Sequence, residues 1–272
     1  MKSLDAPAAH QARELLTLQC GQMSDLLRGL ADAKERIAEE IHAIRKLGKS
    51  LRGGFAVFGL EKKAAREIQA VGRLLAAPRD AVSRFKTWQQ LEWSHDPAAV
   101  AAIHGLLEQQ THSAARLPPA EVIEWCLERV EIARARLDEL DAAEADERCV
   151  AGLQRLHKRL LKRLRRMRRA EVEDFHETRK ALKAWLGAVS IVPGAAGESA
   201  GECMDALLGL ADCLGDENDL STLGEWLGTY GFTQRMLPDL WDALDEKRRK
   251  LRDRSIDESR RLRKQLLDAA KA

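Results

Sequence analysis

The same eight-residue pattern occurs twice in this sequence, and this duplication constrains the fold more than any other feature. Both copies read His-x-x-Arg-Lys-x-x-Lys, and they lie 134 positions apart, at residues 42–49 and 176–183. Further along, Leu75-Ala-Ala-Pro-Arg-Asp80 is matched by Leu214-Gly-Asp-Glu-Asn-Asp219 at an offset of 139. The segment 191–201 is the natural place for the extra residues. Two copies with so long a period predict a duplicated bundle rather than a solenoid.

The residue types favour helices throughout. Aromatic residues make up only 4% of the 272 residues, with a single Tyr, which is far below the usage of a β-sandwich or barrel. Ala, Leu, Glu, Arg and Lys, the strong helix formers, dominate instead. We therefore predict an all-α protein made of two pseudo-symmetric halves of four-helix type, residues 1–144 and 145–272, which together form a single domain.

The hydrophobic pattern sets approximate helix limits. A nearly continuous helical pattern covers 8–58, with a kink expected near Gly29, and further helices are expected at 61–76, 79–93, 119–143 and 145–190. We expect a short helix within a loop at 94–118, a loop at 191–201, and helices at 202–214, 218–229 and 233–270.

No segment has the length and apolarity of a membrane span. The longest stretch without a charged side chain, residues 184–197, has fourteen residues and contains Pro193, whereas a span needs about 20 apolar residues. The N-terminus lacks the apolar core of a signal peptide, so we expect a cytoplasmic protein with no membrane partner. The five cysteines are widely spaced and predict reduced, buried thiols.

The repeated motif is amphipathic when it is placed on a helix. At 100° per residue, the basic residues of the first copy and Arg52 fall within about 80° of His42, whereas Ile44, Leu47 and Leu51 fall on the opposite side. The second copy repeats this arrangement. Each copy is thus a positive stripe that carries a histidine at its N-terminal end.

A third basic stripe precedes the second copy. On a helix, five further cations of residues 155–169 fall within about 60° of Arg155, opposite a stripe of leucines. Residues 151–185 carry a formal charge of +8 (twelve Lys and Arg, four Asp and Glu), and residues 121–148 carry −6 (four Lys and Arg, ten Asp and Glu). The net charge of +2 hides this segregation. The stripe is either a solvated face paired with the acidic segment 121–148 or a binding surface for a polyanion.

The motif histidines show no catalytic or metal-binding pattern. We find no nucleophile elbow and no P-loop, and the second copy fails the zinc pattern His-Glu-x-x-His at its last position. The spacing of His95, His104 and His112 matches no standard metal site. We therefore predict no catalytic residue, no metal and no cofactor. His42 and His176 would either donate to an anionic ligand or bind a carboxylate such as Asp80 or Asp219.

Taken together, these motifs resemble the CHAD family, which is named for conserved histidines in an α-helical domain. The resemblance covers residues 8–270 and rests on the paired His motifs, on Ala-Pro-Arg79-Asp80, and on Leu214-Gly-Asp-Glu-Asn-Asp219-Leu. It implies two helical bundles related by pseudo-twofold symmetry, a basic groove between them, the binding of inorganic polyphosphate, and association with polyphosphate granules.

Carried onto this sequence, the resemblance implies a groove whose second half carries most of the positive charge. Arg28, which corresponds to Lys162 at offset 134, is one of few matching cations in the first helix. The expected polyphosphate-binding residues are Arg28, His42, Arg45, Lys46, Lys49, Arg52, Arg155, Lys158, Arg159, Lys162, Arg166, Arg169, His176, Arg179, Lys180 and Lys183.

We therefore predict a binding module for inorganic polyphosphate rather than an enzyme. Nucleic acid is a less favoured ligand because single strands are held by stacking on exposed aromatic residues, which this chain lacks. The alternatives are a helical nucleic-acid-binding protein, a polyphosphate or triphosphate hydrolase, and a scaffold whose basic face docks an acidic protein. The sequence leaves open whether the basic run 247–254 lines the groove.

Overall fold

The structure, a computed structural model, is all-α in its described parts, as predicted. It describes residues 6–33, 36–93, 96–114, 117–167, 171–192, 194 and 200–269, and in these the chain forms ten α-helices and one short 3₁₀ helix. Arg169 and His95 lie outside these residues. Within them, no helix combines the length and apolarity that crossing a membrane requires.

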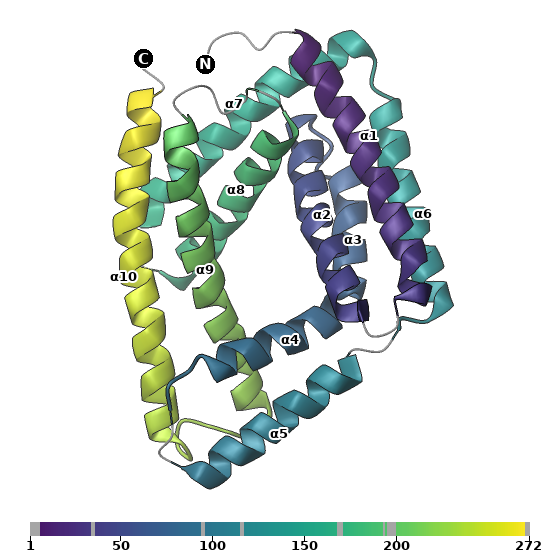
Figure 1. The fold of residues 1–272 in the computed structure, drawn as a ribbon. Helices are drawn as coiled ribbons and strands as arrows, with labels where there is room; N and C mark the ends of the chain where they lie inside the picture. Colours follow the sequence, from purple (N-terminus) through teal and green to yellow (C-terminus); the bar gives the residue numbers. More distant parts are fainter. Residues whose placement is uncertain are drawn as a thin grey trace.

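The two motif helices stand near the centre of the molecule (Figure 1). In that view α2 and α8, which carry the two motif copies, converge toward their C-terminal ends, with α1 beside α2, α9 beside α8, and α4 closing the lower side. The helices are α1 Ala6–Gly29, α2 Ile37–Val57, α3 Ala64–Leu74, α4 Ala76–Gln89, α5 Pro97–Ala114, α6 Ala120–Asp138, α7 Ala142–Arg166, α8 Val172–Ile191, α9 Ala200–Thr229 and α10 Pro238–Ala269, and the 3₁₀ helix η1 is Leu30–Asp32.

The crossing of α2 and α8 depends on a pair of glycines. A Cβ on Gly53 would lie 2.5 Å from the backbone of Gly187, and a Cβ on Gly187 would lie 3.0 Å from the Cα of Gly53. These glycines are 134 positions apart, the same offset as the motif copies. Near the crossing, the hydroxyls of Ser50 and Ser190 share a hydrogen bond of 3.1 Å. The two motif helices therefore touch backbone to backbone at equivalent positions.

Two hydrophobic cores hold the helices together. The larger core joins α1, α2, α3, α6, α7 and α8 with the start of α9 and the end of α10. The smaller core joins α4 and α5 with the end of α9 and the start of α10, around residues such as Trp88, Ile103 and Leu223. Helices α4 and α5 precede residue 144, so each core draws on both predicted halves. The division at 144/145 stays a prediction about the repeat.

The helix α9 differs from the prediction because it continues through 214–218, where a break was expected. Gly215 and Asn218 have low helix propensity, but tertiary contacts outweigh it here. Leu214 and Leu220 are fully packed, and buried Glu217 accepts hydrogen bonds from Arg248 at 3.3 Å and from Arg252 at 2.8 Å. These contacts fix α9 against α10 along its length.

Other helix limits also differ from the prediction, and the range 145–190, expected as one helix, is divided between α7 and α8. The pattern at 8–58 is interrupted by η1 and resumes at Ile37, close to the expected kink. The segment 94–118 is mostly the helix α5, whose start is capped by the Asp96 carboxylate, which accepts N–H groups of Ala98 and Ala99 at 3.0 Å. Likewise, Asp141 accepts the N–H of Glu144 at 2.7 Å and begins α7.

Candidate functional site

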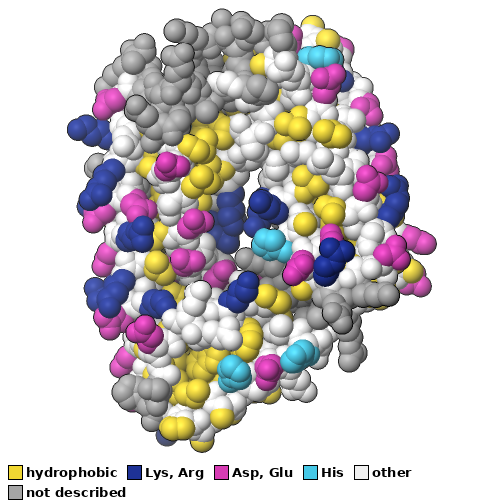
Figure 2. All heavy atoms as spheres, viewed as in Figure 1, with side chains coloured by type: hydrophobic (Ala, Val, Ile, Leu, Met, Phe, Trp, Pro, Cys, Tyr) yellow, Lys and Arg dark blue, Asp and Glu magenta, His cyan; other side chains and the backbone are white. Residues whose placement is uncertain are grey.

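A groove of about 1380 Å³ lies between α1, α2, α8 and α9. Figure 2 shows this face hollowed at its centre, where Lys, Arg and His side chains gather. The groove is formed because α2 and α8 touch near Gly53 and Gly187 and diverge from there, with α1 and α9 standing on either side (Figure 1).

The floor of the groove carries cations from both motif copies. Lys46 and Lys49 come from α2, and Arg179 and Lys183 come from α8. Lys49 and Lys183 are equivalent positions of the repeat. We call these four residues the groove cations. The spacing of the motif predicted all four, and the fold brings them to one surface, two from each copy.

The two sides of the groove carry carboxylates, which the sequence analysis missed. Asp25 and Asp32 line it from the α1 side, and Asp212, Asp216 and Asp219 line it from α9. Burial, followed by the charges of Asp219 and Asp212, raises the pKa of Asp216. The signal was present in the sequence: positions 212, 216 and 219 have the spacing of one helix face.

The rest of the lining includes Arg36 and Glu40 and is otherwise neutral and largely apolar. Leu26, Leu47, Leu186 and Leu208 line the walls, and Leu208 is 46% exposed. None of the described residues that line the groove is aromatic. The groove is therefore a basic floor between acidic sides, whereas the sequence analysis expected a basic groove whose second half carries most of the positive charge.

Two motif cations serve the structure instead of the groove. Arg45 donates to the carbonyl oxygen of Gly72 and lies 3.7 Å from the carboxylate of Asp80. Lys180 pairs with Glu177 at 2.9 Å. Although these residues hold the same motif positions as Arg179 and Lys46, they are not among the described residues that line the groove. The repeat is thus symmetric in sequence and asymmetric in use.

The two motif histidines lie on exposed helix surface. His176 lines a small pocket of about 330 Å³ together with Arg179, so this pocket adjoins the groove. His42 is exposed on α2, next to Ala43, which lines the groove. Their roles as donors to an anion stay predictions. Of the two carboxylates considered as histidine partners, Asp80 contacts Arg45 and Asp219 accepts the hydroxyl of Ser83 at 2.9 Å.

The basic stripe of α7 lies outside the groove lining. Arg155 donates to the carbonyl oxygen of Ala56 at 2.6 Å and to Glu61 at 2.9 Å, and Arg159 lies 4.0 Å from Glu177. The stripe residues Lys158, Lys162 and Arg166 are exposed. The carboxylates Glu61 and Glu177 lie outside the acidic segment 121–148, so they are not the partners that the charge pattern suggested.

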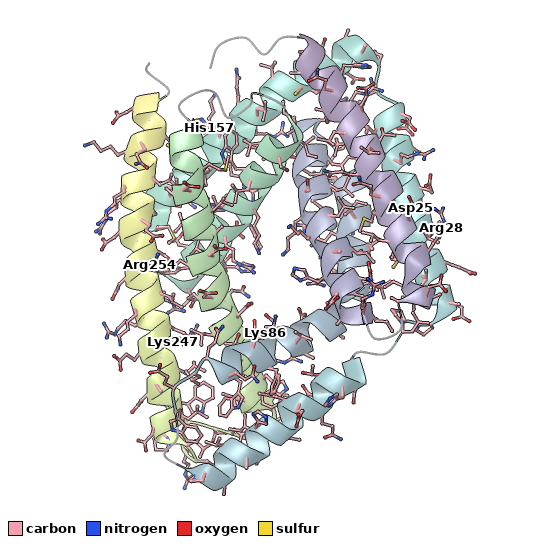
Figure 3. The ribbon with its side chains drawn as sticks, in the orientation of Figure 1. Asp25, Arg28, Lys86, His157, Lys247 and Arg254 are labelled. Carbon is pink, nitrogen blue, oxygen red and sulfur yellow. The ribbon has the colours of Figure 1, made fainter. Side chains whose placement is uncertain are left out.

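The remaining predicted cations also lie beside the groove rather than in its lining. Arg28 pairs with Asp25 at 3.2 Å on α1, and Asp25 is the groove residue of that pair (Figure 3). Partial burial, followed by the neighbouring charge of Arg73, lowers the pKa of Arg52.

The C-terminal basic run lies on α10, and its basic side chains contact other residues of the fold. Lys247 and Arg254 lie on the side of the molecule away from α1 (Figure 3). Lys247 donates to the carbonyl oxygen of Gln90 at 2.5 Å, and Arg254 donates to Glu258 at 2.7 Å. Of the described residues in 247–254, none lines the groove.

The other histidines show no metal site. His104 packs edge-to-face on Phe85 with ring centroids 5.0 Å apart, and His112 is exposed. Within the described ranges, no three His, Cys, Asp or Glu side chains are grouped so as to hold a metal ion.

Comparison with known proteins identifies the family. The family model for the CHAD domain matches residues 14–228, most of the chain. The chain belongs to the CHAD family. A comparison with curated protein sequences finds no match.

Two solved structures are similar in fold to this chain. The crystal structure of the CHAD domain from the plant Ricinus communis is 22% identical, has a TM-score of 0.65, and is matched over 93% of this chain and 91% of that one. The structure of PptA from Streptomyces chartreusis is 16% identical, has a TM-score of 0.55, and is matched over 96% of this chain and 99% of that one. At these identities the likeness shows the fold alone.

Proposed function

We propose that this CHAD protein binds inorganic polyphosphate in the groove between α2 and α8. The observation that carries the proposal is the set of groove cations, which two copies of one motif bring to a single floor. Inorganic polyphosphate has about one negative charge per phosphate. Lys and Arg contact such oxygens through charge-assisted hydrogen bonds, and Arg can make two at once.

The lining of the groove favours inorganic polyphosphate over single-stranded nucleic acid. Proteins that hold single strands stack the bases on aromatic side chains, whereas the described lining of this groove has none. Inorganic polyphosphate has no bases, so it needs no aromatic platform and can bind to the cations of the floor, although carboxylates line the sides of the groove.

We propose binding without cleavage, and a granule-associated location in the cytoplasm. Membership of the CHAD family supports the choice of ligand, because polyphosphate binding is what the resemblance to this family implies. A fluorescent fusion of the full chain should collect at polyphosphate granules in cells that form them. A diffuse signal in such cells would remove the localisation part of the proposal.

The binding claim is tested by titrating the protein with labelled long-chain polyphosphate at several salt concentrations. We expect binding that weakens steeply with salt, because bound cations release counterions from the polyanion. RNA of equal charge concentration should compete poorly. Equal or better competition by RNA would favour a nucleic-acid-binding protein.

The same sample tests for cleavage. Incubation with polyphosphate and Mg²⁺ should release no orthophosphate above that of a protein-free control. Sustained release that depends on protein concentration would show a hydrolase and contradict the binding-only proposal.

A further inference from the structure

The equivalence of the two motif helices extends to the point where they touch. Gly53 and Gly187 occupy equivalent positions and contact each other, so a pseudo-twofold axis that relates α2 to α8 passes between them. Lys49 and Lys183 each precede their glycine by four positions, about one helical turn. The carbonyl oxygen of Lys49 lies 3.0 Å from where a Cβ on Gly187 would be. The two lysines therefore stand on opposite sides of this axis, and both line the groove.

Neutral donors lie beside this pair of charges. Ser50 and Ser190 both line the groove, and their hydroxyls hydrogen-bond to each other across the crossing at 3.1 Å. The motif copies also contribute equally to the floor, with two groove cations each. Among the groove cations, Lys49 and Lys183 form the equivalent pair, whereas Ser50 and Ser190, like Lys46 and Arg179, hold different positions of the repeat.

The chemistry of a polyphosphate chain matches this arrangement at its interior units only. An interior phosphate has two bridging oxygens along the chain and two charged oxygens, and a local twofold axis at phosphorus exchanges the members of each pair. A terminal phosphate has one bridging oxygen and three others, so it lacks that axis.

We infer that the groove holds an interior phosphate of the chain between Lys49 and Lys183 and does not recognise chain ends. This inference rests on the proposed function and narrows its ligand to any polyphosphate with a long enough interior, whatever its ends. One charged oxygen faces each lysine, and the chain continues on both sides of the lysine pair.

The decisive comparison uses two polyphosphate samples of the same length, one with free ends and one with both terminal phosphates converted to phosphoramidates. The wild-type protein should bind both with affinities that agree within about twofold, because the removed terminal charges contribute little to a long polyanion. Loss of about tenfold or more on capping would overturn the inference and leave the proposed function standing. If neither sample binds, the proposed function and the inference fail together.

A second measurement tests the axial position. Lys49→Ala and Lys183→Ala should each weaken binding by about tenfold, as expected for loss of a charge-assisted hydrogen bond, and by amounts that agree with each other. Lys264→Ala, on the exposed surface of α10, is the matched control and should leave the affinity unchanged. A strong effect of one lysine and none of the other would contradict the axial placement. Circular dichroism of each variant separates loss of binding from loss of fold.

Discussion

At the scale of single residues, two carboxylates near the groove illustrate opposite surroundings. Glu177 accepts hydrogen bonds from Lys180 and Arg163, both at 2.9 Å. The hydrogen bond from Lys180 lowers the pKa of Glu177 most, and the positive charges of Lys180, Arg163 and Arg159 lower it further. Asp216 stands among carboxylates on α9, and burial and its acidic neighbours raise its pKa. The first charge stabilises the fold, and the second opposes an anionic ligand.

Neutralising Asp216 should therefore strengthen polyphosphate binding. We expect Asp216→Asn to raise the affinity by about two- to fivefold at neutral pH, the effect of one partly screened charge. In the wild type, the raised pKa means that Asp216 is neutralised earlier than ordinary carboxyls as pH falls, so affinity should rise in that range, and less so in the variant. Titrations between pH 4 and 7 measure this. Asp242 is exposed on α10, so Asp242→Asn should change neither the affinity for polyphosphate nor its dependence on pH. Weaker binding by Asp216→Asn would contradict the account.

Removing the charge of Glu177 should destabilise the protein. The side chain is 16% exposed, and its ion pairs join α7 to α8, so we expect Glu177→Gln to lower the free energy of unfolding by about 1–2 kcal/mol at pH 7. Because the pKa of Glu177 is lowered on folding, its contribution is present above the unfolded pKa and is lost as pH falls through the folded pKa. The difference from wild type in urea unfolding should therefore shrink at acidic pH.

The matched control for Glu177 is Glu246→Gln. Glu246 pairs with Lys250 at 2.8 Å on the exposed surface of α10. Exposed pairs contribute little to stability, so this variant should unfold like the wild type. If both variants behave alike, the partly buried position of Glu177 has no special role.

The groove cations were predictable as residues because helical periodicity places them on one face. The periodicity does not say which cations of that face become engaged by other helices. Arg45 reaches Gly72 and Asp80, and Lys180 reaches Glu177, through contacts that depend on the tertiary structure. The acidic residues of α9 were visible as a stripe in the sequence, but nothing local indicated that this stripe faces the groove.

At the scale of elements, the crossing of α2 and α8 depends on the absence of a side chain at Gly53. A Cβ there would lie 2.5 Å from the Gly187 backbone, so Gly53→Ala must push the helices apart. We expect a loss of about 3 kcal/mol in the free energy of unfolding, and weaker polyphosphate binding because the lysines shift. Thermal and urea unfolding measure the first effect.

Gly21→Ala is the matched control for this element. Gly21 lies within α1 with open space where a Cβ would go. Alanine is the better helix former, so this variant should be as stable as the wild type or more stable by up to about 1 kcal/mol. Equal stability of Gly53→Ala and wild type would show that the backbone contact does not set the crossing.

Most helices were predictable in number and place from periodicity and residue type. The exceptions depend on distant contacts. Helix α9 continues through Gly215 because Glu217 is held by Arg248 and Arg252 of α10, a segment more than thirty positions away. The start of α10 at Pro238 follows a turn with Gly231 at a φ of 85°.

At the scale of the whole molecule, the net charge of +2 conceals a separation of charge over several surfaces. The sequence predicted that the second half would dominate binding through the stripe of α7. The fold instead leaves that stripe outside the groove lining and builds the floor from two cations of each copy. Periodicity cannot predict this, because the placement of α7 follows from its packing against α1, α2, α8 and α10.

The central claim is that polyphosphate binds to the floor of the groove rather than to the most basic helix. Its most direct test compares the double variants Lys49→Ala/Lys183→Ala, in the groove, and Lys158→Ala/Lys162→Ala, on the exposed face of α7, which remove equal charge. In titrations with long-chain polyphosphate at fixed moderate salt, the account predicts a loss of about a hundredfold for the groove pair, if the two lysines act independently, and a loss several times smaller for the α7 pair. Wild-type affinity in the groove variant, or the larger loss in the α7 variant, would contradict it.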